Sequence, residues 1–421
     1  MRVLARHVAN AMEERKLSKA ETARRMRTSR AALDRLLDPD NDAVTLSTFQ
    51  KAAVVGREIR PELTYNAANQ MTQINYGTGQ IQTRTYNARM QLTRMTVAGV
   101  MDLEYRFSPT QNNGQITQMK NYLSGEEVTY GYDELKRLVS AVTTGPEWGH
   151  LFGYDGFGNL LSKTVTKGSA PTWSVAVNGS TNRIVGYGYD ANGNTTSLGG
   201  QPLTYDVENR LVSVVWSGTE YYGYGPDNKR VWRTKASGAT EFYFYGLSGE
   251  RQGIYNVNAV DGSGNIGAYR LVVESVIPKG MQADRDRLGS VVSGGLKYDP
   301  YRAEFTVTSH DRDKFGTYYR DSNTGFNYAD QRYYGSSGGR FLTADPYVAS
   351  AGAAEPGSWN RYAYVEGDPV NRNDPRGLFW ERRVCWRPME RSCGHRRLEQ
   401  DTGLRWRWGV IWAVREACTL Q

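Results

Sequence analysis

The sequence is poor in cysteine and has no long apolar run. Three Cys occur among 421 residues, and all of them (Cys385, Cys393 and Cys418) lie in the last 43. The cysteine-free body excludes a disulfide framework there, and the odd number in the tail leaves at least one thiol free or intermolecular. No segment approaches the ~20 apolar residues that a membrane helix needs, so no membrane span is predicted.

The first residues also lack the features of a secretory leader. The segment MRVLARHVANAMEERKLSKAE becomes charged too early for the apolar core of a signal peptide. The sequence as given therefore predicts a cytoplasmic location.

The residues that are present are unevenly distributed. Residues 1–63 carry 13 Lys and Arg against 9 Asp and Glu, and residues 379–421 carry 9 against 5. The net charge of the whole chain is +8, so the part between these two ends has a net charge of zero. That middle part holds all 28 Tyr and 41 of the 45 Gly. Acidic or nucleic-acid partners are therefore expected only at the two basic ends.

Residues 1–63 predict a small all-α domain. Apolar residues recur there at helical spacing. Ser18 is placed to cap a helix, and Glu21 follows three residues later, as in a capping box. The expected helical segments are Leu4–Met12, Ser18–Met26, Arg30–Leu37 and one that begins at Thr45–Phe49.

Two short helices joined by a tight turn form the pattern of a helix-turn-helix motif. The run Ser18–Leu37 resembles the phage-repressor-like (Xre) family, particularly its antitoxin-type members. The resemblance implies a dimer that binds DNA through the recognition helix Arg30–Leu37. A solvated basic bundle that binds nothing is the alternative. The resemblance places these residues at the major groove or the DNA backbone: Ser29, Arg30, Arg35, Arg24 and Arg27.

From residue 64 to residue 280 the sequence is repetitive. A Tyr followed by Asp or Asn opens similar phrases, of which the clearest are YDELKRLVSAV (132–142), YDGFGNLLSKTV (154–165), YDANGNTTSL (189–198) and YDVENRLVSV (205–214). Each phrase predicts a β-hairpin: a strand ending in Tyr-Asp, a turn of residues that tolerate positive φ, and a returning strand of alternating polarity. A lone hairpin is marginal in water, so we expect successive hairpins to stack edge to edge and hide each apolar face against the neighbouring hairpin.

The phrase Tyr-Asp-x-x-Gly-Asn-x-x-Ser resembles the YD (RHS) repeat. The resemblance implies a mainly β fold in which the hairpins form a strip that encloses a cavity. About eight units are visible here, so a partial strip is expected rather than a closed shell. We interpret most of the tyrosines as packing residues, with a propeller fold and a carbohydrate-binding aromatic surface as alternatives.

Residues 281–378 carry six phrases in order: RLGSVV (287–292), YDPYR (298–302), KFGTYY (314–319), DSNTG (321–325), ADQRYY (329–334) and GRFLTADP (339–346). Their order and spacing resemble the RHS-repeat-associated core domain of polymorphic toxins. The resemblance implies that the chain encapsulates and presents a variable C-terminal polypeptide. It further implies self-cleavage after an Asp-Pro-x-Gly-Leu motif, which is Asp374–Leu378 here.

The family's cleavage is attributed to an aspartyl-protease-like site. Two carboxylates that share one proton can activate a water, one as base and the other as donor to the carbonyl oxygen. By the family pattern Asp345 is the candidate acid/base and Arg340 a supporting cation. Asp374 is the second candidate carboxylate or positions the strand. The scissile bond would be Leu378–Phe379.

These aspartates also have a simpler interpretation. Asp345, Asp368 and Asp374 each precede a proline, and Asp before Pro is common at turns. An insertion at 348–358, rich in Ala and Gly, lengthens the path from Asp345 to the cleavage motif.

The segment 379–421 is too short for most enzymes and is rich in Arg and Trp. The spacing of Cys385, Cys393, His395 and Cys418 matches no zinc motif, so we predict no metal site and no cofactor. We interpret the segment as a truncated toxin remnant, with a membrane-active peptide or frameshifted coding as alternatives. An immunity protein and secretion machinery are the expected protein partners. The rival functions are DNA binding through residues 1–63 and adhesion at a cell surface.

Overall fold

The computed structural model describes residue 12 and residues 17–26, 28–38, 62–76, 79–245, 249, 251–257, 270–273, 283–294, 296–307, 312–346 and 356–378. Over these residues the protein is mainly β, with four antiparallel sheets and two α-helices. None of the helices found there is long and apolar enough to cross a membrane. Several predictions fall outside the described residues: the first helix apart from Met12, Arg27, the helix at Thr45–Phe49, most of the insertion, Phe379 and the whole of 380–421.

The two helices are α2 (Lys19–Arg25) and α3 (Arg30–Leu37), as their sequence pattern predicts. The Ser18 hydroxyl accepts from the Glu21 backbone N–H at 3.2 Å, and the Ser29 hydroxyl caps α3 in the same way. These bonds satisfy N–H groups that the first turn of a helix leaves unpaired. The helices pack through four buried residues: Ala23, Met26, Leu33 and Leu36.

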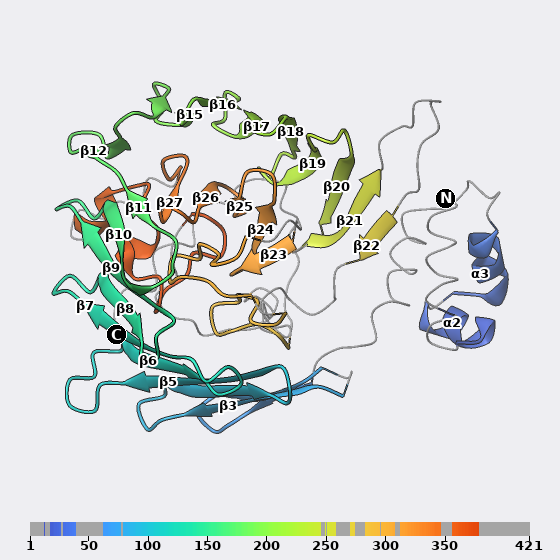
Figure 1. Ribbon diagram of the computed structural model, residues 1–421. Helices are drawn as coiled ribbons and strands as arrows, with labels where there is room; N and C mark the ends of the chain where they lie inside the picture. Colours follow the sequence, from blue (N-terminus) through green and yellow to red (C-terminus); the bar gives the residue numbers. More distant parts are fainter. Residues whose placement is uncertain are drawn as a thin grey trace, which may run out of the picture. The chain divides into compact units, whose positions relative to one another are not determined.

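Two large sheets hold the repeats (Figure 1). In both, strands that follow one another along the chain are also neighbours in the sheet. The first contains β1 (Glu62–Tyr65), β2 (Met71–Asn75), β3 (Ile81–Tyr86), β4 (Leu92–Val97), β5 (Met101–Phe107), β6 (Ile116–Asn121), β7 (Glu127–Tyr132), β8 (Leu138–Thr143), β9 (Trp148–Tyr154), β10 (Leu160–Gly168) and β11 (Trp173–Ser174).

A two-stranded sheet of β12 (Val177–Asn178) and β13 (Arg183–Ile184) follows the first large sheet along the chain. The second large sheet contains β14 (Gly188–Tyr189), β15 (Thr195–Leu198), β16 (Gln201–Tyr205), β17 (Leu211–Val215), β18 (Thr219–Tyr224), β19 (Arg230–Thr234), β20 (Thr240–Tyr245), β21 (Arg251–Val257) and β22 (Arg270–Val273). We call β1–β21 the repeat strip.

Six hairpins of the strip turn in the same way. In these turns an Asp or Asn follows the Tyr, and its side chain accepts hydrogen bonds from backbone N–H groups. Asp155, for example, accepts from Phe157 and Asn159 at 2.9 Å. Such side-chain bonds compete with strand pairing and fix a turn. The residue three places after the acceptor has positive φ, which favours Gly and Asn. The positions are Asn69, Met90, Lys136, Gly158, Gly193 and Asn209.

Five of the repeated tyrosines tie their hairpin to the one before it. The Tyr154 hydroxyl donates to the Leu138 carbonyl at 2.7 Å, and the Tyr132 hydroxyl donates to the Ile116 carbonyl at 2.8 Å. Tyr86, Tyr224 and Tyr245 make the equivalent bond. The ring therefore supplies buried area while its hydroxyl has a partner.

The apolar face of the strip is covered by the segment 283–378, which we call the core segment. Edge-to-edge pairing joins hairpins within one layer, so neighbouring hairpins cannot cover the apolar face of the sheet that they form. Our expectation that each hairpin hides its apolar face against the next was therefore wrong. The main hydrophobic cluster combines Met95, Leu103 and Leu138 of the first sheet with Tyr301, Phe315 and Tyr334 of the core segment. A second cluster joins Leu203, Val214 and Tyr222 to Tyr319, Tyr328 and Tyr333.

The core segment contains a five-stranded sheet that lies between the two large sheets (Figure 1). Its strands are β23 (Arg312–Phe315), β24 (Tyr318–Asp321), β25 (Phe326–Tyr328), β26 (Tyr333–Gly335) and β27 (Arg340–Phe341), followed by the 3-10 turns η2 (Pro356–Trp359) and η3 (Val365–Gly367). Asp286 and Asp299 form the same side-chain turn as the repeats, with Gly289 and Arg302 at positive φ. Both faces of this sheet are buried because a large sheet packs on each.

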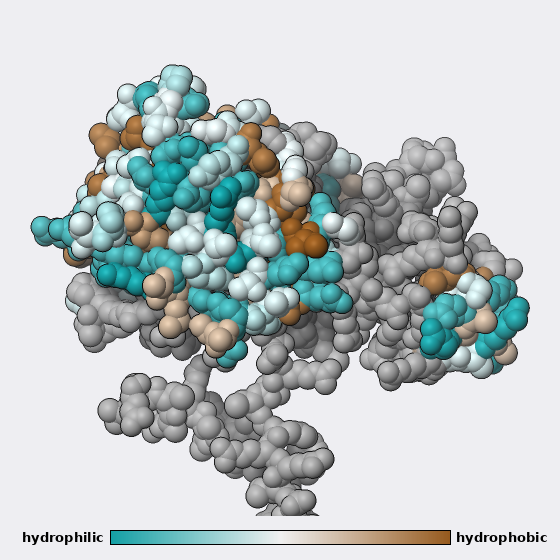
Figure 2. Space-filling view, turned by 90° about the horizontal axis from the view of Figure 1, so that it is seen from below, coloured by the Kyte–Doolittle hydropathy of each residue, from teal (hydrophilic) through white to brown (hydrophobic). Residues whose placement is uncertain are grey.

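Buried ion pairs add to the contact between strip and core segment. The Arg230 guanidinium donates to Asp321 at 2.6 Å and lies over the rings of Tyr243 and Tyr328 at 4.7 and 4.5 Å. Arg251 pairs with Asp313 at 2.9 Å. In these pairs the strip supplies the cation and the core segment the carboxylate. Figure 2 views the side on which β3–β8 lie in Figure 1, and that face is largely hydrophilic.

Candidate functional site

One arginine holds two buried aspartates of the core segment. The Arg332 Nη2 atom lies 3.3 Å from Asp345 Oδ2 and 3.3 Å from Asp374 Oδ2. The two carboxylate oxygens can therefore be no further apart than twice that distance. Asp345 is 5% exposed and Asp374 is 3% exposed. Two carboxylates in so dry a place interact strongly with each other and with the cation.

Asp374 begins a turn of the same kind as the repeat turns. Its Oδ1 atom accepts from the backbone N–H of Arg376 at 3.3 Å and of Leu378 at 3.0 Å. The third residue after it, Gly377, has φ +67°. A Cβ at Gly377 would lie 2.7 Å from the Ala329 carbonyl oxygen, so only glycine fits. The cleavage motif is thus a repeat-type turn whose aspartate lies beside Arg332.

The Arg332 side chain is fixed by further contacts. It lies over the Phe341 ring with 3.6 Å between its guanidinium carbon and the centroid. It donates to the Arg361 carbonyl at 3.0 Å and also to the Gly377 carbonyl. The planar fork of arginine suits such a divergent set of acceptors. Arg332 therefore positions both the carboxylates and the backbone next to Leu378.

The buried charges change one another's pKa. Burial raises the pKa of Asp374, while the Arg332 guanidinium and the backbone N–H of Leu378 oppose this rise. Burial also lowers the pKa of Arg332, which the two carboxylates oppose. Asp374 consequently keeps its proton at a pH at which an ordinary aspartate has lost it.

A small cavity lies against these groups. Its volume is about 40 Å³, and its lining includes Arg332, Asp345, Asp374 and Leu378. That volume is sufficient for a water molecule, and the lining supplies polar partners for it. The lining also includes the η3 turn, where Val365 and Glu366 have φ of 44° and 55°. Non-glycine residues at positive φ are strained, and such strain is concentrated at functional sites.

The structure brings together three of the predicted site residues: Asp345, Asp374 and Leu378 all line this cavity. Arg340 is placed elsewhere. Its guanidinium donates to the Asn182 carbonyl at 2.7 Å and lies 4.7 Å from the Tyr362 ring centroid. Phe379, the other side of the predicted scissile bond, lies outside the described residues.

Sequence reasoning missed Arg332. It lies in the phrase ADQRYY, which was recognised only as part of the family pattern. Nothing in the phrase marks this arginine as the partner of Asp345. A buried arginine among tyrosines needs a counter-charge, and that was the one signal in the sequence.

Asp368 behaves as a turn residue. Its Oδ1 atom accepts from the backbone and side chain of Asn371 at 3.2 and 2.8 Å. The Asn371 amide in turn bonds the Tyr132 hydroxyl and the Ile116 N–H of the strip. This aspartate therefore helps to seat the core segment on the strip.

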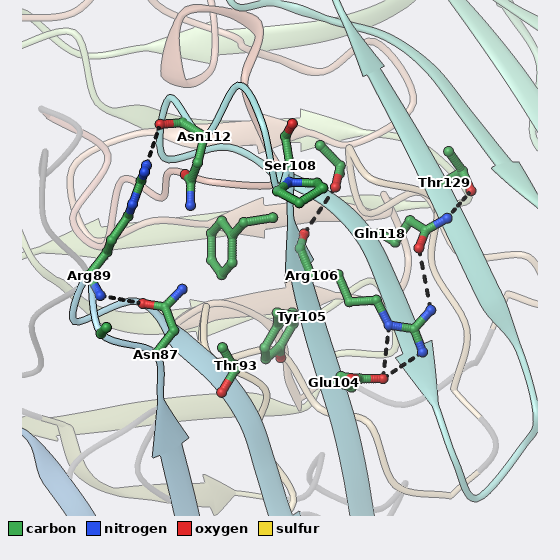
Figure 3. Close-up of a pocket in the computed structure, with 14 residues that line it drawn as sticks. Asn87, Arg89, Thr93, Glu104, Tyr105, Arg106, Ser108, Asn112, Gln118 and Thr129 are labelled. Carbon is green, nitrogen blue, oxygen red and sulfur yellow. Dashed lines mark hydrogen bonds and ion pairs between the residues drawn. The ribbon is translucent and has the colours of Figure 1, made fainter.

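A broader, open hollow of about 870 Å³ lies on the polar face of β4–β7 (Figure 3). Its charged side chains bond one another: Arg106 donates to Glu104 at 2.6 Å and to Gln118 at 3.3 Å. This is the ordinary solvated face of an antiparallel sheet.

The predicted DNA-contacting residues that the structure describes lie on α3 and before it. Arg30 and Arg35 are exposed, and Ser29 caps the helix. Arg24, also exposed, pairs with Glu21 at 2.8 Å. The interpretation of residues 1–63 as a phage-repressor-like domain stays a prediction.

Comparison with known proteins gives one matching family, described as Teneurin YD-shell, over residues 62–259. Among curated proteins, the tRNA nuclease WapA of Bacillus subtilis (strain 168) is 29% identical over 253 residues, which cover 54% of this chain and 11% of that protein. The tRNA3(Ser)-specific nuclease WapA of Bacillus spizizenii is 28% identical over 268 residues, covering 54% and 11%. This chain thus spans a small part of these relatives.

Among solved structures, the TcdB2-TccC3-Cdc42 crystal structure matches with a TM-score of 0.55 at 22% identity, covering 75% of this chain and 19% of that chain. The Photorhabdus luminescens Tc holotoxin pore matches with a TM-score of 0.56 at 21% identity, covering 77% and 19%. Likeness at this identity concerns the fold. Together the comparisons support a YD-shell fold for the repeat region.

Proposed function

We propose that this chain encloses and presents the polypeptide that follows Leu378, and that it cuts the Leu378–Phe379 bond itself. The observation that carries the proposal is the shared Arg332, which holds Asp345 and Asp374 at one cavity with Leu378. The relatives named as tRNA nucleases and a similar structure described as lacking a hypervariable C-terminal region support a toxin-delivery role. The presented segment would be 379–421, and an immunity protein and secretion machinery its partners.

The proposed chemistry needs one proton on the carboxylate pair. Asp374, whose pKa is raised by burial, holds this proton and donates it toward the Leu378 carbonyl oxygen. Asp345 takes a proton from a water in the cavity, and the water attacks the carbonyl carbon. As the bond from the carbonyl carbon to nitrogen breaks, Asp345 returns that proton to the Phe379 nitrogen, and the carbonyl oxygen gives its proton back to Asp374. Arg332 stabilises the negative charge of the pair and fixes its geometry.

Mass spectrometry of the purified chain tests this proposal. We expect a fragment that ends at Leu378, and we expect Asp345→Asn and Arg332→Gln to abolish it. The matched control is Arg340→Gln, because Arg340 contacts Asn182 and Tyr362 instead of the pair. An intact wild-type chain, or cleavage that survives Asp345→Asn, would contradict the proposal.

A second candidate function is DNA binding through α3. Arg30 and Arg35 are exposed on a capped helix that follows a second short helix after a tight turn. Binding to a mixed-sequence duplex, measured by fluorescence anisotropy, should weaken as salt rises, because counterions are released. Arg30→Ala with Arg35→Ala should remove it, and Arg89→Ala on the strip should not. Equal binding by both variants would exclude α3 as the DNA contact.

A further inference from the structure

A second buried cluster, outside the cavity of Asp345 and Asp374, joins the strip to the core segment. The Lys163 ammonium nitrogen on β10 lies 2.8 Å from Asp299 Oδ2, and both side chains are 0% exposed. The Ser336 carbonyl accepts a further N–H of Lys163 at 2.9 Å. A charged pair with no solvent contact is costly to form, because both groups have lost their hydration.

The surroundings of this pair are aromatic. Phe152 lies opposite Lys163 in the pairing of β9 and β10, and its ring is 5.5 Å from the Tyr301 ring. The Tyr301 ring centroid is 5.3 Å from the Lys163 nitrogen. The His150 ring makes tilted contacts with two further rings, with centroids 5.5 Å from Phe152 and 5.8 Å from Trp148. These rings exclude water from the pair.

Asp299 presents its carboxyl carbon to Lys163 in a fixed orientation. Its Oδ1 atom accepts from the Ala303 backbone N–H at 2.9 Å as part of the repeat-type turn, while Oδ2 faces the lysine. A backbone N–H on Oδ1 would stabilise negative charge that forms there when a nucleophile attacks the carbon. The turn thus supplies an oxyanion donor next to a buried amine.

His150 supplies a basic nitrogen at the same cluster. The ring is 0% exposed, and its Nε2 atom lies 2.9 Å from the Pro171 carbonyl oxygen. That oxygen can only accept, so the neutral ring carries its proton on Nε2 and Nδ1 is an acceptor. Nδ1 is buried and has no hydrogen-bond partner. His150 and Phe152 are two residues apart on β9 and therefore lie on the same face of the sheet, and Phe152 is the residue opposite Lys163. Burial lowers the pKa of His150, so the ring is neutral.

We propose that Lys163 and Asp299 condense into an intramolecular amide bond. A proton first passes from the ammonium to the carboxylate, which gives an amine and a carboxylic acid. The Lys163 nitrogen attacks the Asp299 carboxyl carbon, and the Ala303 N–H stabilises the charge on Oδ1. His150 Nδ1 takes a proton from the nitrogen and returns it to Oδ2. The bond from carbon to Oδ2 breaks, and one water leaves, with no oxidant or reductant needed. Burial also lowers the pKa of Lys163, which favours the amine.

The amide would join residues 136 positions apart in the sequence. It would fasten β10 to the core segment, and both of its residues precede Leu378. Cleavage at Leu378 would therefore leave the whole cross-link within the fragment that ends at Leu378. This proposal does not depend on self-cleavage.

The test is the mass of the purified wild-type chain, denatured and reduced, or of its fragment ending at Leu378 if it is cut. We expect a mass lower than that of the sequence by one water, and a proteolytic peptide that links Lys163 to Asp299. Lys163→Arg keeps a buried cation but lacks the amine nucleophile, so its full mass is expected. A wild-type chain with the full mass, or a water loss that persists in Lys163→Arg, would overturn the proposal.

The role of His150 is tested separately by the time course of the water loss after synthesis. We expect His150→Gln to slow it by about 10²-fold or more, the range seen for general acid–base groups. Because the pKa of His150 is lowered, the rate in the wild type should rise with pH only below the ordinary histidine pKa of 6.5, as the imidazole loses its proton, and the variant should not show that rise. An unchanged rate in the variant would overturn the assignment of His150.

Discussion

The turns at Asp206 and Asp374 share one local structure and differ in what surrounds them. In each, the aspartate Oδ1 accepts the N–H groups of the second and fourth residues after it. In each, the third residue has positive φ, Asn209 in one case and Gly377 in the other. Asp206 then pairs with Arg210 of its own turn at 2.7 Å, whereas Asp374 meets Arg332, forty-two residues earlier in the chain.

The difference separates the local role of this aspartate from its chemical role. The turn needs only an acceptor, which Asn66 and Asn87 also provide in the strip. The proposed chemistry needs a buried carboxylate with a second carboxylate at hand. Exchanging acid for amide at both turns should therefore affect them unequally.

The largest expected effect is on cleavage. Asp374→Asn keeps the acceptor of the turn but removes the proton donor, so we expect cleavage at Leu378 to fall by about 10²-fold or more. Asp206→Asn should leave cleavage unchanged. Quantitative mass spectrometry of both variants at matched times measures this. Equal cleavage in the two would remove Asp374 from the chemistry.

The next effect is on pH dependence. Because burial raises the pKa of Asp374, the proton that cleavage requires persists above the ordinary aspartate pKa of 3.8. Cleavage should therefore fall, by about tenfold per pH unit at most, once the pH exceeds the raised value. By linkage, the same carboxyl favours folding below its ordinary pKa, and that contribution is lost as the pH rises through the raised pKa. A rate that increases steadily toward alkaline pH would contradict this.

Gly158 and Gly377 each occupy the third position after the aspartate of their turn. Alanine at these two positions compares how much stability each site loses. An alanine at Gly158 would be strained by φ +76° but would meet nothing within 4 Å, and should cost about 1 kcal/mol. At Gly377 it would also meet the Ala329 carbonyl at 2.7 Å, so we expect a loss of at least about 2 kcal/mol. Urea unfolding of Gly158→Ala and Gly377→Ala measures both. Similar losses of stability would mean that the core segment shifts to make room for the alanine side chain at Gly377.

The smallest effect is a gain. Met90 has φ 61° at the turn position where Asn69 and Asn209 stand in other hairpins, and its side chain is exposed. Asparagine adopts this conformation at lower cost than methionine. Met90→Asn should therefore stabilise the protein by roughly 0.5 kcal/mol, measured by the same urea unfolding. A loss of stability would show that the Met90 side chain contributes contacts.

The repeat hairpins could be predicted because their cause is local. The turns after Tyr132-Asp133 and Tyr154-Asp155 are predicted from residues no more than five positions away. The structure has a hairpin at each of them. The capped helices α2 and α3 were predictable for the same reason. The covering of the strip was not, because an alternating strand shows that it has an apolar face but not which segment packs on it.

At the candidate site, the family pattern pointed to Asp345, Asp374 and Leu378, and the structure places all three at one cavity. The choice between Arg340 and Arg332 depended on which side of the core segment each arginine reaches, and nothing near either residue in the sequence encodes that.

The sequence by itself determined the turns, the strand order and the tyrosine anchors, since each depends on residues close together along the chain. Only the tertiary structure decided that Arg332 stands between Asp345 and Asp374, and that Lys163 meets Asp299. Both sets of contacts form because the core segment folds back onto the strip and removes these side chains from water. Burial, which no short stretch of sequence contains, gives ordinary acidic and basic side chains their particular chemistry.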